Sequence, residues 1–301
     1  MNELENEGIK CGMAALVGPP NVGKSTLLNR LLGQKISIVS PKPQTTRNRI
    51  LGIVNEPAYQ IVLLDTPGLH KASSPLNREM VRLALESLSE VEVIVFMIDA
   101  SLPLPKKGVK PPTSCLTGRN TPTILLLNKI DLLDKEKVLP LIEAYQKLHP
   151  FTAIIPASAL ENDGIDLLLE ELLKLLPIAP RLYPEDIPTD VTERFIVAET
   201  IREKVFLRTG QEIPYSSAVM VDSFKAREDG SLVTIHATIF IEKDSQKGIV
   251  IGKGGKKLTE IGRAARRDIE EMLGQKVLLK LWVKVKKNWT QNNSFLKELG
   301  F

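Results

Sequence analysis

The stretch Gly18-Pro19-Pro20-Asn21-Val22-Gly23-Lys24-Ser25 holds two glycines with four residues between them, followed by Lys and Ser. An apolar run before it, Met13–Val17, predicts a buried strand, and Thr26–Leu32 predicts the start of a helix. Glycines let backbone N–H groups close around phosphate oxygens, and the helix start adds its positive dipole end. An ordinary glycine-rich turn is the simpler alternative, but strand and helix in this order favour a phosphate-binding loop. We expect Gly18–Thr26 to contact the ligand, with Lys24 on the outer phosphates and Ser25 on magnesium.

Length and composition predict a two-domain globular protein. The chain has 301 residues, of which 43% are apolar, and no apolar run is long enough to span a bilayer. Its acidic start, Met1–Glu7, lacks the apolar stretch of a signal peptide. Cys11 and Cys115 have no metal-ligand spacing and favour a reducing compartment.

The positive charge is confined to one part of the chain. Residues 1–180 hold 19 basic and 19 acidic residues, whereas residues 181–301 hold 21 and 17, which accounts for the net charge of +4. Lys243–Lys287 alone contains 13 basic and 5 acidic residues. Such an excess favours a polyanionic partner, although a solvated Lys/Arg face is the alternative.

A second phosphate motif follows two predicted strands, Ile50–Val54 and Tyr59–Leu64. The latter ends at Asp65-Thr66-Pro67-Gly68, where an acid at a strand end precedes a glycine-containing turn. Alone this is a common turn. About 40 residues after a phosphate-binding loop, it favours a carboxylate that supports magnesium beside a terminal phosphate.

The tetrapeptide Asn128-Lys129-Ile130-Asp131 indicates the base. It follows the predicted strand Thr123–Leu127. An aspartate can accept both the ring N–H and the amino hydrogens of guanine, a pairing that adenine does not offer. We expect Asn128 to tether the site and contact the base, and the Lys129 stem to cover the ring. In Ala157-Ser158-Ala159, the backbone N–H groups of Ser158 and Ala159 could meet the base oxygen. An Asn-Lys turn after a strand is the alternative.

Strands alternating with helices predict an α/β domain with a mainly parallel sheet over residues 1–176. Its further elements are a buried strand, Val91–Ile98, and helices over Leu76–Leu88, Leu139–Leu148 and Ile165–Leu176. Residues 101–122 contain five prolines, so we expect a loop there with at most a short helix over Thr113–Leu116. A strand over Ala153–Pro156 completes the sheet.

A proline-rich segment, residues 177–190, predicts a semi-rigid linker to a second domain, residues 191–301. The pattern in that domain gives the order helix, strand, strand, helix, helix, strand. Gly252-Lys253-Gly254-Gly255 lies between the two later helices, at the place of the Gly-x-x-Gly loop of a KH domain. Its glycines would let a nucleic-acid backbone approach, although a tight helix–helix turn is the alternative. We expect the remaining RNA contacts from Ile249, Ile251, Lys256, Lys257 and Arg266.

The nucleotide motifs in this order, followed by an α+β KH-like domain of type II, resemble the bacterial Era family of GTPases over nearly the whole chain. The most specific stretches are Gln44–Arg47, Asp65–His70, Gln246–Gly255 and Leu281–Trp289. The resemblance implies slow hydrolysis of GTP to GDP with magnesium. It also implies binding of single-stranded RNA near the 3′ end of small-subunit ribosomal RNA, and a part in assembly of that subunit. A cytoplasmic location with peripheral contact to the inner membrane is implied as well.

The resemblance also implies roles for single residues. Thr46, with Thr45 as the alternative, would coordinate magnesium together with Ser25 and Asp65, and the Gly68 N–H would contact the terminal phosphate. Leu69 stands where a Ras-like GTPase has a water-orienting glutamine, and a leucine side chain makes no hydrogen bond. Asn21 raises the hypothesis that potassium supplies charge in the transition state. Lys24, Thr46, Gly68 and Asn21 are therefore the candidate catalytic residues.

Two other functions stay open from the sequence. One is a GTPase of tRNA modification or another translation step, but the KH-like domain at the carboxyl end argues against it. The other is a non-enzymatic RNA-binding adaptor that only holds nucleotide, which Leu69 makes conceivable. The proline-rich segment at 101–122 departs from the helix that similar proteins have there, without touching a nucleotide motif.

Overall fold

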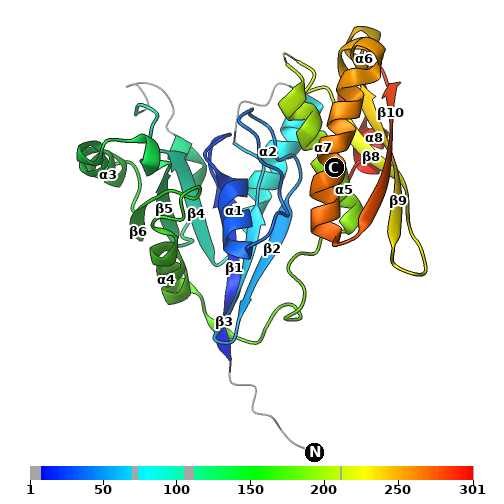
Figure 1. Cartoon of the computed structure of the whole chain (residues 1–301). Coiled ribbons are helices and arrows are strands. Elements are labelled where there is room, and N and C mark those ends of the chain that lie inside the picture. The colour runs from blue at the N-terminus through cyan, green and yellow to red at the C-terminus, as the bar shows by residue number, and fades with distance from the viewer. Residues whose placement is uncertain (1–7, 70–73, 105–111, 211, 301) are drawn as a thin grey trace, which may run out of the picture. The chain divides into compact units, whose positions relative to one another are not determined.

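The computed structural model describes residues 8–69, 74–104, 112–210 and 212–300 (Figure 1). The chain divides into two compact units. The first comprises Met1–Ser37, Thr46–Lys71 and Met80–Asp190, and the second comprises Ile38–Thr45, Ala72–Glu79 and Val191–Phe301. Two short pieces from the first third of the sequence therefore group with the second unit, which the sequence patterns do not indicate.

A seven-stranded sheet forms the centre of the first unit, in the order β2-β3-β1-β4-β5-β6, with β7 paired to β1. Only β2 and β7 run antiparallel to their neighbours, which confirms the mainly parallel sheet. The strands are β1 (Ile9–Val17), β2 (Ile50–Glu56), β3 (Tyr59–Asp65), β4 (Val93–Asp99), β5 (Thr123–Asn128), β6 (Ala153–Ala157) and β7 (Ile178–Ala179). The α-helices are α1 (Lys24–Leu32), α2 (Pro75–Ser87), α3 (Val138–Gln146) and α4 (Ile165–Leu175).

The central strands are apolar because both faces of the sheet are covered. All six residues of β5 are buried, as are Val93–Ile98 of β4. Between these two parallel strands the structure describes one 3-10 helix, Pro112–Leu116, which confirms the expected short helix. Residues 105–111 of the proline-rich segment lie outside the described residues, as does His70.

Residues 177–190 lie along strands of the first unit. The Cys11 amide donates to Pro177 O at 3.0 Å, and the Ile53 amide donates to Pro188 O at 2.8 Å. The buried Gln60 side chain accepts from the Leu182 amide at 2.7 Å and donates to Tyr183 O at 2.8 Å. The segment expected to be a linker is thus bonded to one unit over most of its length. The domain limits at 176 and 190 stay a prediction.

The second unit packs three of its helices against one face of a three-stranded sheet, ordered β10-β9-β8. Strands β8 and β9 are antiparallel and β9 and β10 are parallel, with a bulge between Val221 and Ser223. The elements are α5 (Glu193–Arg208), β8 (Ala218–Ala226), β9 (Leu232–Ile241), α6 (Asp244–Ile251), α7 (Lys256–Leu273), β10 (Lys276–Val285) and α8 (Asn293–Glu298). The predicted order of elements is confirmed. One core joins α5, α6 and α7 to the sheet, with Ile201, Ile261 and Ile239 fully buried in it.

Candidate functional site

The phosphate-binding loop connects β1 to α1 at the carboxyl end of the sheet (Figure 1). Two positions of the loop require glycine for steric reasons. A Cβ at Gly18 would lie 2.2 Å from Met97 O, and a Cβ at Gly23 would lie 2.3 Å from Asn128 Nδ2. Gly23 also has a φ of 100°, in the region that favours glycine. A side chain at either position would displace a neighbouring strand end or loop, so the loop requires glycine at both.

Lys24 is the first residue of α1 and is 6% exposed. Its Nζ donates to Pro19 O at 2.9 Å and to Gly18 O at 3.2 Å, so the ammonium group lies across the loop. Burial lowers the pKa of Lys24 to about 8, and the Asp65 carboxylate opposes that shift. Phosphate oxygens held by the same loop would bring further negative charge to the buried cation.

Ser25, Thr46 and Asp65 converge from three separate segments. The Ser25 and Thr46 hydroxyl oxygens are 2.7 Å apart, and Ser25 Oγ donates to Asp65 Oδ2 at 2.7 Å. Ser37 Oγ donates to the same carboxylate oxygen at 2.8 Å. Asp65 is fully buried, and its Oδ1 has no hydrogen-bond partner among the described residues. Two hydroxyls and a carboxylate with an orphaned oxygen form the hard oxygen set that Mg²⁺ prefers.

The geometry distinguishes Thr46 from its alternative, Thr45. The Thr45 hydroxyl donates to Lys42 O at 2.6 Å and lies 2.7 Å from Ser40 Oγ, within its own turn. Only Thr46 faces Ser25. Burial raises the pKa of Asp65, and the hydrogen bond from Ser25 and the charge of Lys24 act in the opposite direction. A cation among these oxygens would hold Asp65 ionised.

The segment after Asp65 lies against the phosphate-binding loop. Thr66 Oγ1 donates to Leu16 O at 2.8 Å, and the Leu69 amide donates to Gly18 O at 3.0 Å. A Cβ at Gly68 would lie 2.7 Å from Pro20 Cα, so only glycine fits this approach. The turn Asp65–Gly68 is thus placed beside the loop by backbone contact, and the Leu69 side chain packs on the core of β4 and β5.

Asn128 links three segments at the carboxyl end of the sheet. It is 2% exposed; its Nδ2 donates to Val22 O at 2.7 Å, and its Oδ1 accepts from the Ala159 amide at 2.9 Å. Lys129 follows with a φ of 67° and pairs with Asp99 Oδ2 at 2.7 Å. Burial acts to raise the pKa of Asp99, but hydrogen bonds from Lys129 and Ser101 outweigh it and leave that pKa below its usual value. Asp131 is exposed on the next turn.

The amides of Ser158 and Ala159 are already engaged. Ser158 N donates to Asp163 O at 2.9 Å, in addition to the Ala159 bond to Asn128. The sequence prediction treats both amides as donors for a base oxygen. In this structure the Ala159 amide would have to share its hydrogen with Asn128 Oδ1, and the Ser158 amide belongs to a local turn.

The Gly-x-x-Gly sequence forms a tight turn between α6 and α7 in the second unit. Gly252, Gly254 and Gly255 have φ values of 73°, 58° and 77°. Lys253, Lys256 and Lys257 surround the turn, and the first two are exposed. A Cβ at Gly254 or Gly255 would meet nothing within 4 Å, so open space lies beside the turn.

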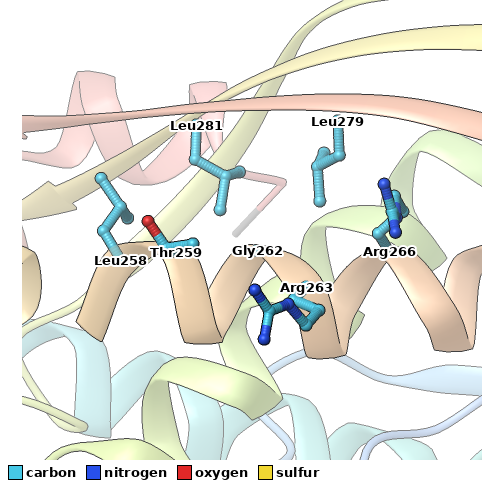
Figure 2. Close-up of a pocket in the computed structure, with 7 residues that line it drawn as sticks. All are labelled: Leu258, Thr259, Gly262, Arg263, Arg266, Leu279 and Leu281. Carbon is cyan, nitrogen blue, oxygen red and sulfur yellow. The ribbon is translucent and has the colours of Figure 1, made fainter. Parts of the chain in front are cut away.

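A groove of about 500 Å³ lies between α7 and β10. Figure 2 shows Leu279 and Leu281 of β10 directed toward α7, where Gly262 leaves room between the flanking side chains. Its lining combines three leucines with Arg263 and Arg266, so apolar and cationic groups share the groove. The lining residues are Leu258, Thr259, Gly262, Arg263, Arg266, Leu279 and Leu281.

Of the predicted RNA contacts, Arg266 lines this groove and the isoleucines do not. Ile249 is 42% exposed on α6, and Ile251 is partly buried against the core of the second unit. The sequence reasoning missed the β10 side of the groove. The signal that could have found it is the period-2 pattern of β10, which places Leu279 and Leu281 on one face.

Two family models match the chain. The model described as "50S ribosome-binding GTPase" matches residues 13–129, and the KH domain model matches residues 212–290. GTP and GDP are therefore the nucleotides of the first unit. No helix among the described residues is long and apolar enough to cross a membrane.

Relatives match over nearly the full length. GTPase Era of Geobacter metallireducens is 52% identical and covers 99% of this chain and 100% of its own. GTPase Era of Staphylococcus haemolyticus is 46% identical, with 97% of each chain covered. A crystal structure of Era in complex with MgGDPNP and nucleotides 1506–1542 of 16S ribosomal RNA has a TM-score of 0.91 and 42% identity, covering 97% of this chain and 99% of the other. A structure of an Aquifex aeolicus Era variant bound to GDP·AlF4⁻ matches equally well. The chain is a GTPase that belongs to the Era family.

Proposed function

We propose that this GTPase is a nucleotide-controlled switch that binds single-stranded RNA near the 3′ end of small-subunit ribosomal RNA and assists maturation of that subunit. The observation that carries the proposal is the combination of two sites in one chain. Ser25, Thr46 and Asp65 converge in the first unit, and a cationic groove lies beside a Gly-x-x-Gly turn in the second unit. The related Era bound to nucleotides 1506–1542 of 16S ribosomal RNA supports this RNA as the ligand.

In the first unit, the proposed site residues are those that the sequence predicts. Backbone N–H groups of Gly18–Thr26 bind the phosphates, and Lys24 lies on the outer ones. Ser25, Thr46 and Asp65 hold Mg²⁺, which neutralises charge on the phosphate oxygens when bound. Gly68 contacts the terminal phosphate, Asp131 pairs with guanine, and Asn128 and Lys129 hold and cover the base.

In the second unit, the backbone of the RNA lies on the turn Gly252–Gly255. Lys253, Lys256 and Lys257 neutralise its phosphates. Unstacked bases enter the groove, where Leu279 and Leu281 supply apolar contact and Arg266 supplies a planar cation for stacking.

The loop that carries Thr46 connects the two sites along the chain. Thr46 belongs to the first unit and bonds to Ser25, whereas Ile38–Thr45 belongs to the second unit. There Arg202 of α5 donates to Thr45 O at 2.5 Å, and the Val39 amide donates to Glu203 Oε1 at 3.1 Å. A change at Thr46 on loss of the terminal phosphate would therefore reach the second unit through one peptide bond.

Two finer points extend the proposal. Potassium beside Asn21 would supply positive charge in the transition state, and equal turnover in sodium and potassium buffers would exclude it. Peripheral association of a cytoplasmic protein with the inner membrane is the second point. Co-sedimentation with anionic lipid vesicles tests it, and no sedimentation at physiological salt would exclude it.

Phosphate release under multiple turnover tests the enzymatic part. We expect more than one phosphate per protein, whereas a non-enzymatic adaptor would release less than one. Binding to the 16S RNA segment 1506–1542, compared with transfer RNA at equal salt, tests the RNA. Equal affinity for both would favour the alternative of a tRNA-directed GTPase over the proposed role.

A further inference from the structure

Strand β10 has a second face that the groove does not use. Val277, Leu279, Leu281, Val283 and Val285 point into the core of the second unit or into the groove. Because side chains alternate along a strand, the residues between them face outward. These outward residues, which we call the Lys-Trp row, are Lys276, Leu278, Lys280, Trp282 and Lys284, and all five are exposed.

Trp282 is the centre of this row and is 43% exposed. His236 of β9 meets it edge-on, with ring centroids 5.2 Å apart. This T-shaped contact helps to hold the indole on the sheet face. The chain has two tryptophans, and the other, Trp289, is fully buried and donates to Ser216 O at 2.9 Å.

The C-terminal helix α8 covers a different part of the same sheet face. Phe295 of α8 packs on Phe240 of β9 at 5.0 Å, and Lys286 Nζ lies 3.4 Å from the centre of the Phe295 ring. Trp282 and Leu278 stay exposed to 43% and 44%. The sheet face is thus closed at one end and open at the Lys-Trp row.

The lysines around Trp282 favour an anionic partner. Lys280 and Lys284 flank it on the strand, and Lys225 of β8 is exposed on the same side of the sheet. Asp222 on this face is already engaged, because its Oδ2 accepts the Thr238 hydroxyl at 2.7 Å. Lysines on an edge strand also discourage pairing with other chains, but that role does not explain an exposed indole between them. An indole with a lysine on each side fits a base with its two phosphates.

We propose that the RNA strand held in the groove continues over the free edge of β10 and stacks a base on Trp282, with Lys280 and Lys284 on the flanking phosphates. β10 is the edge strand of its sheet, so no other strand separates the groove from the Lys-Trp row. This inference rests on the RNA binding proposed above. It lengthens the binding site by the nucleotides beyond the groove.

Acrylamide quenching of tryptophan fluorescence tests the stacking directly. Trp289 is buried, so the quencher reports mainly on Trp282 in the wild-type chain, and W282F supplies the background. With saturating 16S RNA segment 1506–1542, we expect quenching of the wild type to fall toward the W282F value. If quenching is unchanged while fluorescence anisotropy of labelled RNA shows saturation, the inference is wrong and the proposed function stands.

Affinities of matched variants give a second test. Stacking on an aromatic contributes about 1–3 kcal/mol per base, so Trp282→Ala should bind the RNA about 5- to 150-fold more weakly, whereas Trp282→Phe keeps most of the affinity. Replacing Lys280 and Lys284 by Gln should lower the salt slope of log K by roughly 1.4, at about 0.7 per phosphate contact. The control replaces Lys135 and Lys147, exposed lysines of the first unit, by Gln.

The variant Gly254→Asp, in the Gly-x-x-Gly turn, separates the two proposals. Loss of RNA binding in Gly254→Asp with normal binding in Trp282→Ala overturns the inference alone. Normal binding in both overturns the proposed RNA site as well. A third outcome would also overturn the inference: small-subunit proteins freed of RNA protect Trp282 from acrylamide quenching, and the RNA does not. That outcome would assign the Lys-Trp row to a protein partner.

Discussion

The substitution Gly262→Ala should stabilise the protein and weaken RNA binding at the same time. Gly262 lies in the middle of α7, on the side that faces β10 across the groove. A Cβ built there has only Leu281 Cδ1 as a near neighbour, at 3.4 Å, which is ordinary van der Waals contact. The folded chain therefore accepts the methyl group, and the methyl group occupies the floor of the groove.

The two effects have magnitudes that can be measured separately. Alanine is favoured over glycine inside a helix by about 0.8–1.0 kcal/mol, which raises the melting temperature of a domain of this size by roughly 4 °C. A methyl group inserted into a well-packed contact costs about 1–3 kcal/mol. RNA affinity should therefore fall about 5- to 150-fold.

Calorimetry and filter binding on the full chain give the two quantities, with the 16S RNA segment 1506–1542 at one salt concentration. Gly248→Ala is the matched control, because Gly248 is an exposed helical glycine of α6 with nothing within 4 Å of its Cβ position and lies outside the groove lining. It should raise the melting temperature and leave affinity unchanged. A Gly262→Ala protein that gains stability and binds RNA like the wild type would refute the proposed groove.

Three further changes test other parts of the site. Asp131→Asn should weaken GTP binding by about 2–3 kcal/mol, roughly 30- to 150-fold, and improve binding of xanthosine triphosphate; an unchanged base preference in competition titrations would exclude guanine recognition by Asp131. Gly254→Asp should reduce RNA affinity with GTP affinity intact, whereas Gly254→Asn, which tolerates the same positive φ without the charge, should bind RNA more tightly than Gly254→Asp; equal binding by the two would show that charge is not the cause. Asn128→Ala should lower the melting temperature even without nucleotide, because Val22 O and the Ala159 amide lose their buried partner at about 1–3 kcal/mol each; an unchanged melting temperature would show that the tether is not structural.

The sequence predicts that several candidate nucleotide-site residues lie together, because these residues follow strands of one sheet. Asp65 and Asn128 each end a buried strand, Lys24 begins the helix that follows another, and parallel strands bring their carboxyl ends to one edge. Spacing along the chain is therefore enough to place them together. Thr46 is different: it lies in a loop, and only the structure shows that it, and not Thr45, faces Ser25.

The groove is harder to predict because its two sides come from separate elements. Gly262 in a helical pattern indicates a weak helix position, and Leu279 and Leu281 indicate ordinary core. Only the structure shows that these residues line one groove, because β10 pairs parallel with β9 and lies alongside α7. The attachment of residues 177–190 to the first unit is also hard to predict. Most of these bonds use backbone groups of the segment, and a proline-rich sequence does not specify where those groups bond.

The position of Thr46 limits how the two sites can communicate. In this structure its hydroxyl is 2.7 Å from Ser25 Oγ, whereas the backbone carbonyl of the preceding residue is bonded to Arg202. If Thr46 binds Mg²⁺ only with GTP, the conformation of the adjoining Ile38–Thr45 segment has different free energies in the two nucleotide states. Coupling of this kind typically amounts to 1–3 kcal/mol and is reciprocal, so GTP would change RNA affinity by the factor by which RNA changes GTP affinity. Hydrolysis removes this coupling free energy. A slow GTPase, with Leu69 in place of a glutamine, would therefore keep its RNA-binding state long enough for assembly steps on the small subunit. Slow hydrolysis thus fits a switch better than a rapid catalyst.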